Sequence, residues 1–236
     1  GGVALNCVAN GKLQKEKIFD RIWVQPAAGD AGGSLGAALA LWYKEFDNQR
    51  QVKGDRMKGS YLGPIYQKNT IIAELKSAGA IFTELNKEKV IKKTAEALAE
   101  GKAVGWFNGR MEFGPRALGN RSIIADPRSP LMQKTLNLKV KFRESFRPFA
   151  PSVLCERANQ WFELDCESPY MLLVANVHKN HKIEITEEDQ NLFGIDKLNI
   201  ARSNIPAVTH VDYSARVQTV SKDTNPTYHA LISEFQ

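Results

Sequence analysis

The chain has 236 residues, with 32 Lys and Arg against 26 Asp and Glu, so its formal net charge is +6. This length suits one large or two small domains, and no apolar run approaches the ~20 residues that cross a bilayer, which excludes a membrane-spanning helix. Three widely spaced cysteines, Cys7, Cys155 and Cys166, exclude a disulfide framework and a zinc finger. Because no signal peptide is evident either, we expect a cytoplasmic protein.

The first sixty residues contain two glycine-rich segments that suit a ligand. Residues 1–11 predict a Gly-Gly turn and a short helix that stops at Gly11, and such a turn lets an anion approach bare backbone N–H groups. Residues 18–25 have the β-branched content of a strand, and a glycine-rich loop then precedes an apolar helix over 35–46. Asp30 in that loop either caps the helix or binds a metal or phosphate group.

A polar loop over residues 47–58 predicts a boundary between two units, which we place near Ser60. Beyond it the pattern predicts helices over 69–78 and 87–100, the second capped by Asn86, and short strands over 81–83 and 103–107. The second of these helices should bury one apolar stripe, formed by Val90, Ile91, Thr94, Ala95, Leu98 and Ala99.

The positive charge is concentrated in one stretch of the chain. From Arg110 to Arg147 there are six Arg and three Lys against three acids, Glu112, Asp126 and Glu144, which gives 9 − 3 = +6, the net charge of the whole chain. Arg binds phosphate or carboxylate bidentately and tolerates partial burial. Glycines and phenylalanines surround these arginines, so we predict a formed anion-binding pocket; the alternative is a set of surface salt bridges.

The last third of the chain predicts a core with a polar face. We expect strands over 151–154 and 170–177, a helical turn over 157–162, a charged surface loop over 178–199 and a final helix that begins at Pro226. Two alternating runs, 207–212 and 215–220, each predict a strand with a polar pair on one face. These pairs are His210 with Asp212 and Arg216 with Gln218, and they either line a site or face water on a half-exposed hairpin.

Several long motifs resemble the O-carbamoyltransferase family of nodulation and antibiotic biosynthesis. They are GRMEFGPRALGNRSIIADPR, VKFRESFRPFAPS and PAVTHVDYSARVQTV, preceded by GGVALNCVANGKL and QPAAGDAGGSLGAAL in the family's order. The resemblance implies an α/β protein of two domains. Residues 1–60 would be the end of an actin-like ATPase-type domain that transfers the carbamoyl group. Residues 61–236 would be most of a YrdC-like (threonylcarbamoyl-AMP synthase-like) twisted α/β domain.

The resemblance also implies a two-step reaction. Carbamoyl phosphate and ATP give carbamoyl-adenylate in the second domain, and the first domain passes the carbamoyl group to a hydroxyl of a sugar or natural product. Motif by motif, it implies catalytic or phosphate contacts from Lys141, Arg143, Arg116, Arg121 and Arg147. It implies nucleotide or carbamoyl contacts from His210, Asp212, Arg216, Gln218, Gly2 and Asn6, and a metal ligand at Asp30.

The family's cofactors are ATP and a divalent metal, iron or magnesium. The partnering metal-binding histidines and an Asn-Thr-Ser-Phe-Asn strand of the family are absent from these residues. We therefore expect a piece of a longer protein that binds no metal and is inactive by itself. The alternative function is an RNA-binding module related to tRNA threonylcarbamoylation proteins. The chain has no RNP-type aromatic motif, so we expect small-molecule partners and no nucleic acid.

Overall fold

The computed structural model describes residues 1–51 and 54–236 and confirms the α/β class. Five strands form two small sheets: β1 (Val104–Phe107), β2 (Arg121–Ile124), β3 (Ser152–Leu154), β4 (Leu173–Asn176) and β5 (Ser214–Val220). β1 and β2 pair antiparallel, with Trp106 opposite Ser122. In the second sheet the order is β3-β5-β4, where β3 is parallel and β4 antiparallel to β5.

Strand β5 is central because its sequence suits burial on both faces. Of its seven residues, only Arg216 is not fully buried. Alternating Val and Thr side chains fit a pleated interior, and Val217 packs in the main apolar cluster with Val153, Phe162 and Val177. Arg216 and Gln218 are thus carried by a strand that packing holds in place.

The described residues form nine α-helices. They are α1 (Cys7–Glu16), α2 (Asp30–Ala40), α3 (Lys68–Ser77), α4 (Lys87–Ala99), α5 (Met132–Lys139), α6 (Ala158–Trp161), α7 (Glu187–Gln190), α8 (Gly194–Leu198) and α9 (Pro226–Phe235). A π-helical turn (Leu41–Glu45) extends α2, and short 3₁₀ turns occur at Lys58–Ser60, Cys155–Arg157, Lys179–His181 and Pro206–Val208. None of the described helices is both long and apolar enough to cross a membrane.

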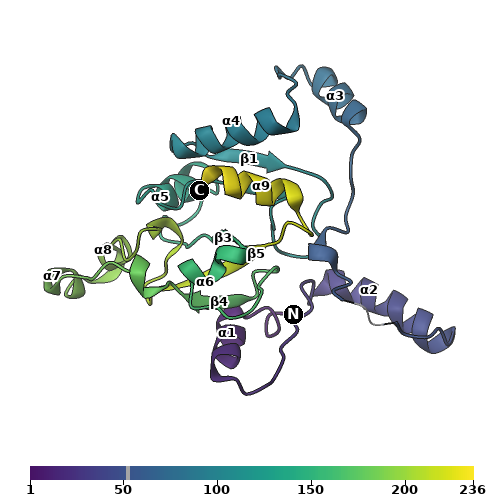
Figure 1. The fold of residues 1–236 in the computed structure, drawn as a ribbon, viewed down its shortest axis with the longest axis horizontal. Coiled ribbons are helices and arrows are strands. Elements are labelled where there is room, and N and C mark those ends of the chain that lie inside the picture. The colour runs from purple at the N-terminus through teal and green to yellow at the C-terminus, as the bar shows by residue number, and fades with distance from the viewer. Residues whose placement is uncertain (52–53) are drawn as a thin grey trace.

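Helices α4 and α9 lie side by side and cover β1 (Figure 1). The predicted cap of α4 is confirmed, since the Asn86 side chain accepts a hydrogen bond from Lys89 N. Its predicted stripe is confirmed at Ile91, Thr94, Ala95 and Leu98, whereas Val90 and Ala99 are exposed. The stripe packs with Trp106, Val220, Tyr228 and Leu231, which joins the two sheets through one apolar cluster.

Helix α1 packs against β4 and runs past the residue that was expected to end it. A Cβ atom at Gly11 would lie 2.4 Å from Val174 O, so Gly11 allows the close approach of helix and strand backbones. The buried Asn10 side chain donates to Leu172 O at 3.2 Å and fixes the same contact. The helix ends instead at Glu16, after which Lys17 adopts a left-handed conformation.

Three predicted strands are wrong. Residues 18–25 and 81–83 have no partner strand in the described part of the chain, and Ile81 is fully exposed. Residues 207–212 form a 3₁₀ turn and then a tight turn in which His210 N donates to Ser214 O at 2.8 Å. In each case local β propensity finds no neighbouring strand with which to share its hydrogen bonds.

Two elements near the basic stretch were not predicted. Strand β2 and helix α5 lie inside a sequence that reads as a Gly- and Arg-rich loop. The helix expected over 35–46 begins earlier, at Asp30, and the charged excursion at 178–199 contains the short helices α7 and α8. The other predicted helices and strands are confirmed to within a few residues, including α3, α4, β1, β3, β4 and α9.

Candidate functional site

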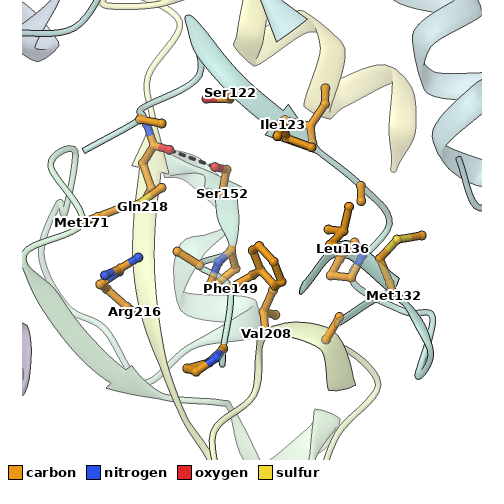
Figure 2. Close-up of a pocket in the computed structure, with 18 of the residues that line it drawn as sticks. Ser122, Ile123, Met132, Leu136, Phe149, Ser152, Met171, Val208, Arg216 and Gln218 are labelled. Atoms are coloured by element: carbon orange, nitrogen blue, oxygen red, sulfur yellow. Dashed lines mark hydrogen bonds between the residues drawn. The ribbon is translucent and has the colours of Figure 1, made fainter. Parts of the chain in front are cut away.

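A cavity of about 650 Å³ opens between the two sheets. It is lined by the loop before β2, by β2 itself, by α5, by Lys141, Arg143 and residues 147–152, by β5 and by α9. Figure 2 shows Arg216 and Gln218 on one side of this cavity, the apolar side chains of Met132 and Leu136 on the other, and Val208 between them beside Phe149. The cavity therefore has a cationic side and an apolar side.

Six of the predicted site residues line this cavity, although they come from three separate motifs. They are Arg116, Lys141, Arg143, Arg147, Arg216 and Gln218. The fold thus brings residues about a hundred positions apart to one site, as the prediction of a formed pocket requires.

The electrostatics of the cavity are those of an unneutralised cation cluster. Burial lowers the pKa of Arg216, and the nearby positive charges of Arg116 and Arg143 lower it further. The Nε atoms of Arg116 and Arg216 are both buried and have no hydrogen-bond partner among the described residues. Buried donors without partners are costly, so this arrangement suits a ligand that supplies anionic oxygens.

The three acids of the basic stretch do not neutralise this cluster. Asp126 lines the cavity, but its buried carboxylate pairs with Arg128, which does not line it. Glu144 approaches Arg147 at 3.7 Å as an exposed pair, a geometry that contributes little. Glu112 is bound to backbone N–H groups instead, and in the described structure no ion pair involves Arg116, Lys141 or Arg143.

Glu112 fixes the loop that carries Arg116. Its Oε1 accepts hydrogen bonds from the N–H groups of Leu118 at 2.7 Å, Asn120 at 2.9 Å and Arg121 at 3.3 Å. Gly119 in this loop has φ +100°, and a Cβ atom there would lie 2.3 Å from the Tyr228 ring. Glycine at this position therefore has a steric reason.

Gln218 connects β5, β3 and the same loop. Its Nε2 donates to Leu118 O at 2.8 Å, and its Oε1 accepts from Ser152 Oγ at 2.9 Å, as Figure 2 shows. Tyr61 donates to the same carbonyl at 2.7 Å. Burial raises the pKa of Tyr61 to about 12, with a contribution from the negative Glu112, so its hydroxyl stays a donor.

Arg121 lies outside the cavity lining. Its guanidinium stacks on Phe107 at 3.4 Å and donates to the carbonyls of Asn108, Gly109 and Asn120. These contacts use the guanidinium to close the β1–β2 connection. Arg121 was predicted to contact phosphate, but the fold does not place it with the cations that line the cavity.

His210 and Asp212 also lie outside the lining, in the turn before β5. Asp212 Oδ1 accepts from Ser214 Oγ at 2.6 Å, and His210 Nδ1 lies 3.1 Å from the same hydroxyl. Burial lowers the pKa of His210 and Arg216 lowers it further, while Asp212 opposes both. Of the two predicted polar pairs, the structure thus brings only Arg216 and Gln218 to the cavity.

The predicted residues of the first sixty have local roles. Asn6 caps α1 by accepting from Ala9 N at 3.1 Å, and Gly2 is an exposed turn residue. Asp30 is exposed in the first turn of α2, where a carboxylate favours the helix dipole. Within the described residues no three His, Cys, Asp or Glu side chains gather as a metal site, so Asp30 alone does not fit a tightly bound metal.

Two residues that matter for the cavity carry no obvious signal in the sequence. Glu112 reads as a salt-bridge partner and Asn137 as a polar position on a surface, yet both are buried and bind backbone groups. A polar residue inside an otherwise amphipathic segment is too common to single out. Their roles depend on which loops the fold places beside them.

Comparisons with known proteins identify the family of this chain. A family model described as "Carbamoyltransferase C-terminus" matches residues 95–236, and one described as "Carbamoyltransferase N-terminus" matches residues 1–39.

The whole chain is 56% identical to uncharacterized protein sll1178 of Synechocystis, covering 39% of that protein. It is 42% identical to nodulation protein NolNO of Sinorhizobium fredii and covers 32% of it. It is 33% identical to the 3'-hydroxymethylcephem-O-carbamoyltransferase of Amycolatopsis lactamdurans and covers 38% of it. Each of these relatives matches the whole of this chain, and the chain spans about a third to two fifths of their length. The chain belongs to the carbamoyltransferase family.

Proposed function

We propose that the protein of which these residues are part is an O-carbamoyltransferase, and that the cavity forms carbamoyl-adenylate from carbamoyl phosphate and ATP. The observation that carries the proposal is the convergence of Arg116, Arg143 and Arg216 in one cavity without an acidic partner among the described residues. Both proposed substrates are anions that such a cluster attracts. The family relationship supplies the carbamoyl group as the unit transferred.

The two sides of the cavity suit the two halves of a nucleotide. We assign the cationic side, with Lys141 and Arg143, to the phosphates and the carbamate. The apolar side, with Met132 and Leu136, suits an uncharged purine ring. Water would first cleave carbamoyl phosphate into carbamate and inorganic phosphate. A carbamate oxygen would then attack the α-phosphorus of ATP and pyrophosphate would leave, a step whose barrier falls when fixed cations hold two anions in line.

The carbamoyl group would then pass to a hydroxyl, and AMP would leave. The acceptor we propose is a sugar or natural-product hydroxyl, in keeping with the cephem O-carbamoyltransferase among the relatives. In line with the family resemblance, we propose an actin-like transfer domain up to residue 60 and a YrdC-like domain from residue 61. A divalent metal in the transfer domain would need ligands beyond Asp30.

Substitution of Lys141 and Arg143, which lie two residues apart in the chain, tests the proposal in the full-length protein. We expect Lys141→Ala and Arg143→Ala each to lower ATP-dependent consumption of carbamoyl phosphate by about 100-fold, since one electrostatic contact to a transition state contributes ~3 kcal/mol. Lys134→Ala is the matched control, because Lys134 is an exposed lysine of α5 outside the cavity. Wild-type turnover in both cavity variants would refute the assignment.

A further inference from the structure

We infer that Asn137 is the positioning residue of the cavity, which holds the clamp loop, residues 141–147, so that its cations face the ligand. This inference rests on the proposed function, because it assigns a purpose to Lys141, Arg143 and Arg147 in that reaction. Asn137 does not line the cavity itself. It is fully buried on α5, directly before the clamp loop.

Every polar atom of the Asn137 side chain is used on the clamp loop. Its Nδ2 donates to Ser145 O at 3.0 Å and to Arg147 O at 2.8 Å. Its Oδ1 accepts from Arg143 Nε at 2.6 Å, and its own backbone carbonyl accepts from Arg143 N at 3.0 Å. One amide therefore fixes both the backbone path of the loop and the direction of a guanidinium.

Few other side chains define the shape of the clamp loop, which also has backbone hydrogen bonds from Lys141 N to Leu136 O at 2.9 Å and from Arg147 N to Glu144 O at 3.3 Å. Phe142 adopts a left-handed conformation with φ 48°, and its side chain is 86% exposed, so it contributes no packing. A left-handed non-glycine residue persists only where the surroundings impose it. Gln133, one helical turn before Asn137, adds one more bond by donating to Phe146 O at 2.8 Å.

Arg143 shows what this support achieves. Its guanidinium is held between Asn137 and the Phe149 ring, whose centroid lies 5.0 Å away, and it still lines the cavity. Fixing a cation before the ligand arrives removes the entropy cost of ordering it on binding. Loss of Asn137 should therefore weaken ligand binding through the loop, although no contact to the ligand is removed.

The test uses the full-length protein with Asn137→Leu, which keeps the size and removes all three hydrogen bonds, and Asn137→Asp, which keeps only the acceptor for Arg143. We expect the KM for ATP to rise at least about tenfold in the Leu variant and less in the Asp variant, with a smaller fall in kcat. Limited trypsin digestion gives a second readout. Cleavage after Lys141 and Arg143 should accelerate at least about tenfold, because a loop that is no longer held in one conformation enters the protease active site more readily.

Ser203→Ala controls for a general loss of stability, since Ser203 is buried and hydrogen-bonded but does not line the cavity. It should leave the KM for ATP and cleavage of the clamp loop unchanged. If Asn137→Leu does not yield folded protein, Gln133→Leu should show the same two effects at about threefold. Unchanged KM and unchanged cleavage in the folded variants would overturn the inference.

The two proposals fail in different ways. If Lys141→Ala and Arg143→Ala lower turnover while the Asn137 variants behave as wild type, the proposed function stands and the positioning role is wrong. If trypsin cleaves the loop faster in the Asn137 variants but Lys141→Ala and Arg143→Ala keep full turnover, the loop is held as described and the proposed function is wrong.

Discussion

Arg216 carries a charge where the fold would be more stable without one. It lies on the central strand β5, its Nε is buried without a partner in the described structure, and the charges of Arg116 and Arg143 oppose its own. Residues that reduce stability in this way are found where ligands bind. At the residue scale, the positive charge of the cavity therefore lowers the free energy of unfolding.

Replacement of this arginine by an apolar residue of similar length should stabilise the protein. We expect Arg216→Met to raise the free energy of unfolding by about 1 kcal/mol, because it removes desolvation and like-charge repulsion together. Urea unfolding of wild type and variant measures the difference. Arg21→Met, which changes an exposed arginine, should change stability by less than about 0.5 kcal/mol. If Arg216→Met is less stable than wild type, the claim that the charge of Arg216 lacks a compensating partner is wrong.

His210 should make stability depend on pH. Its pKa in the folded protein is lowered, chiefly by burial, so the unfolded chain takes up a proton first as the pH falls below about 6.5. Stability should therefore decrease between pH 7.5 and 5.5. His210→Gln should reduce this slope in urea unfolding at the two pH values. An identical slope in both proteins would show that His210 does not titrate differently on folding.

At the scale of elements, the loop before β2 depends on the small size of one residue. Gly119 combines a left-handed backbone with a close approach to the Tyr228 ring of α9. The same loop presents Arg116 and is held by Glu112. Its shape is therefore set by α9 from outside and by a buried carboxylate from inside.

Gly119→Ala should destabilise the protein by about 3 kcal/mol, because the new methyl group overlaps the ring and the backbone is strained. The melting temperature and urea midpoint measure this loss. Gly36→Ala is the matched control, since Gly36 lies in the exposed helix α2 with open space around it and alanine favours helix by up to ~1 kcal/mol. Equal stability of the two variants would contradict the steric account.

Sequence patterns predicted the elements that carry their own signals. The stripe and Asn86 cap of α4 and the Pro226 start of α9 are local features, and both helices are confirmed. The strand predictions at 18–25, 81–83 and 207–212 failed because a strand also needs a partner, which local sequence does not specify. Helix α5 was missed because its sequence, MQKTLNLK, has only a weak apolar stripe and no side-chain cap, and residues typical of loops surround it.

At the scale of the whole molecule, the charge distribution was the most informative property of the sequence. The basic stretch predicted an anion pocket, and four of its cations line one cavity: Arg116, Lys141, Arg143 and Arg147. Composition could not separate these from Arg121 and Arg128, which bind protein groups instead. That division depends on which backbone carbonyls and acids the fold brings near each guanidinium.

The central claim is that this cavity binds a nucleotide through guanidinium groups that the protein leaves unneutralised. Its most direct test is the dissociation constant of ATP for the full-length protein, measured by equilibrium dialysis for wild type, Arg216→Met and Arg21→Met. The account predicts at least about tenfold weaker binding by Arg216→Met and unchanged binding by Arg21→Met. Equal affinity of all three proteins for ATP would contradict it.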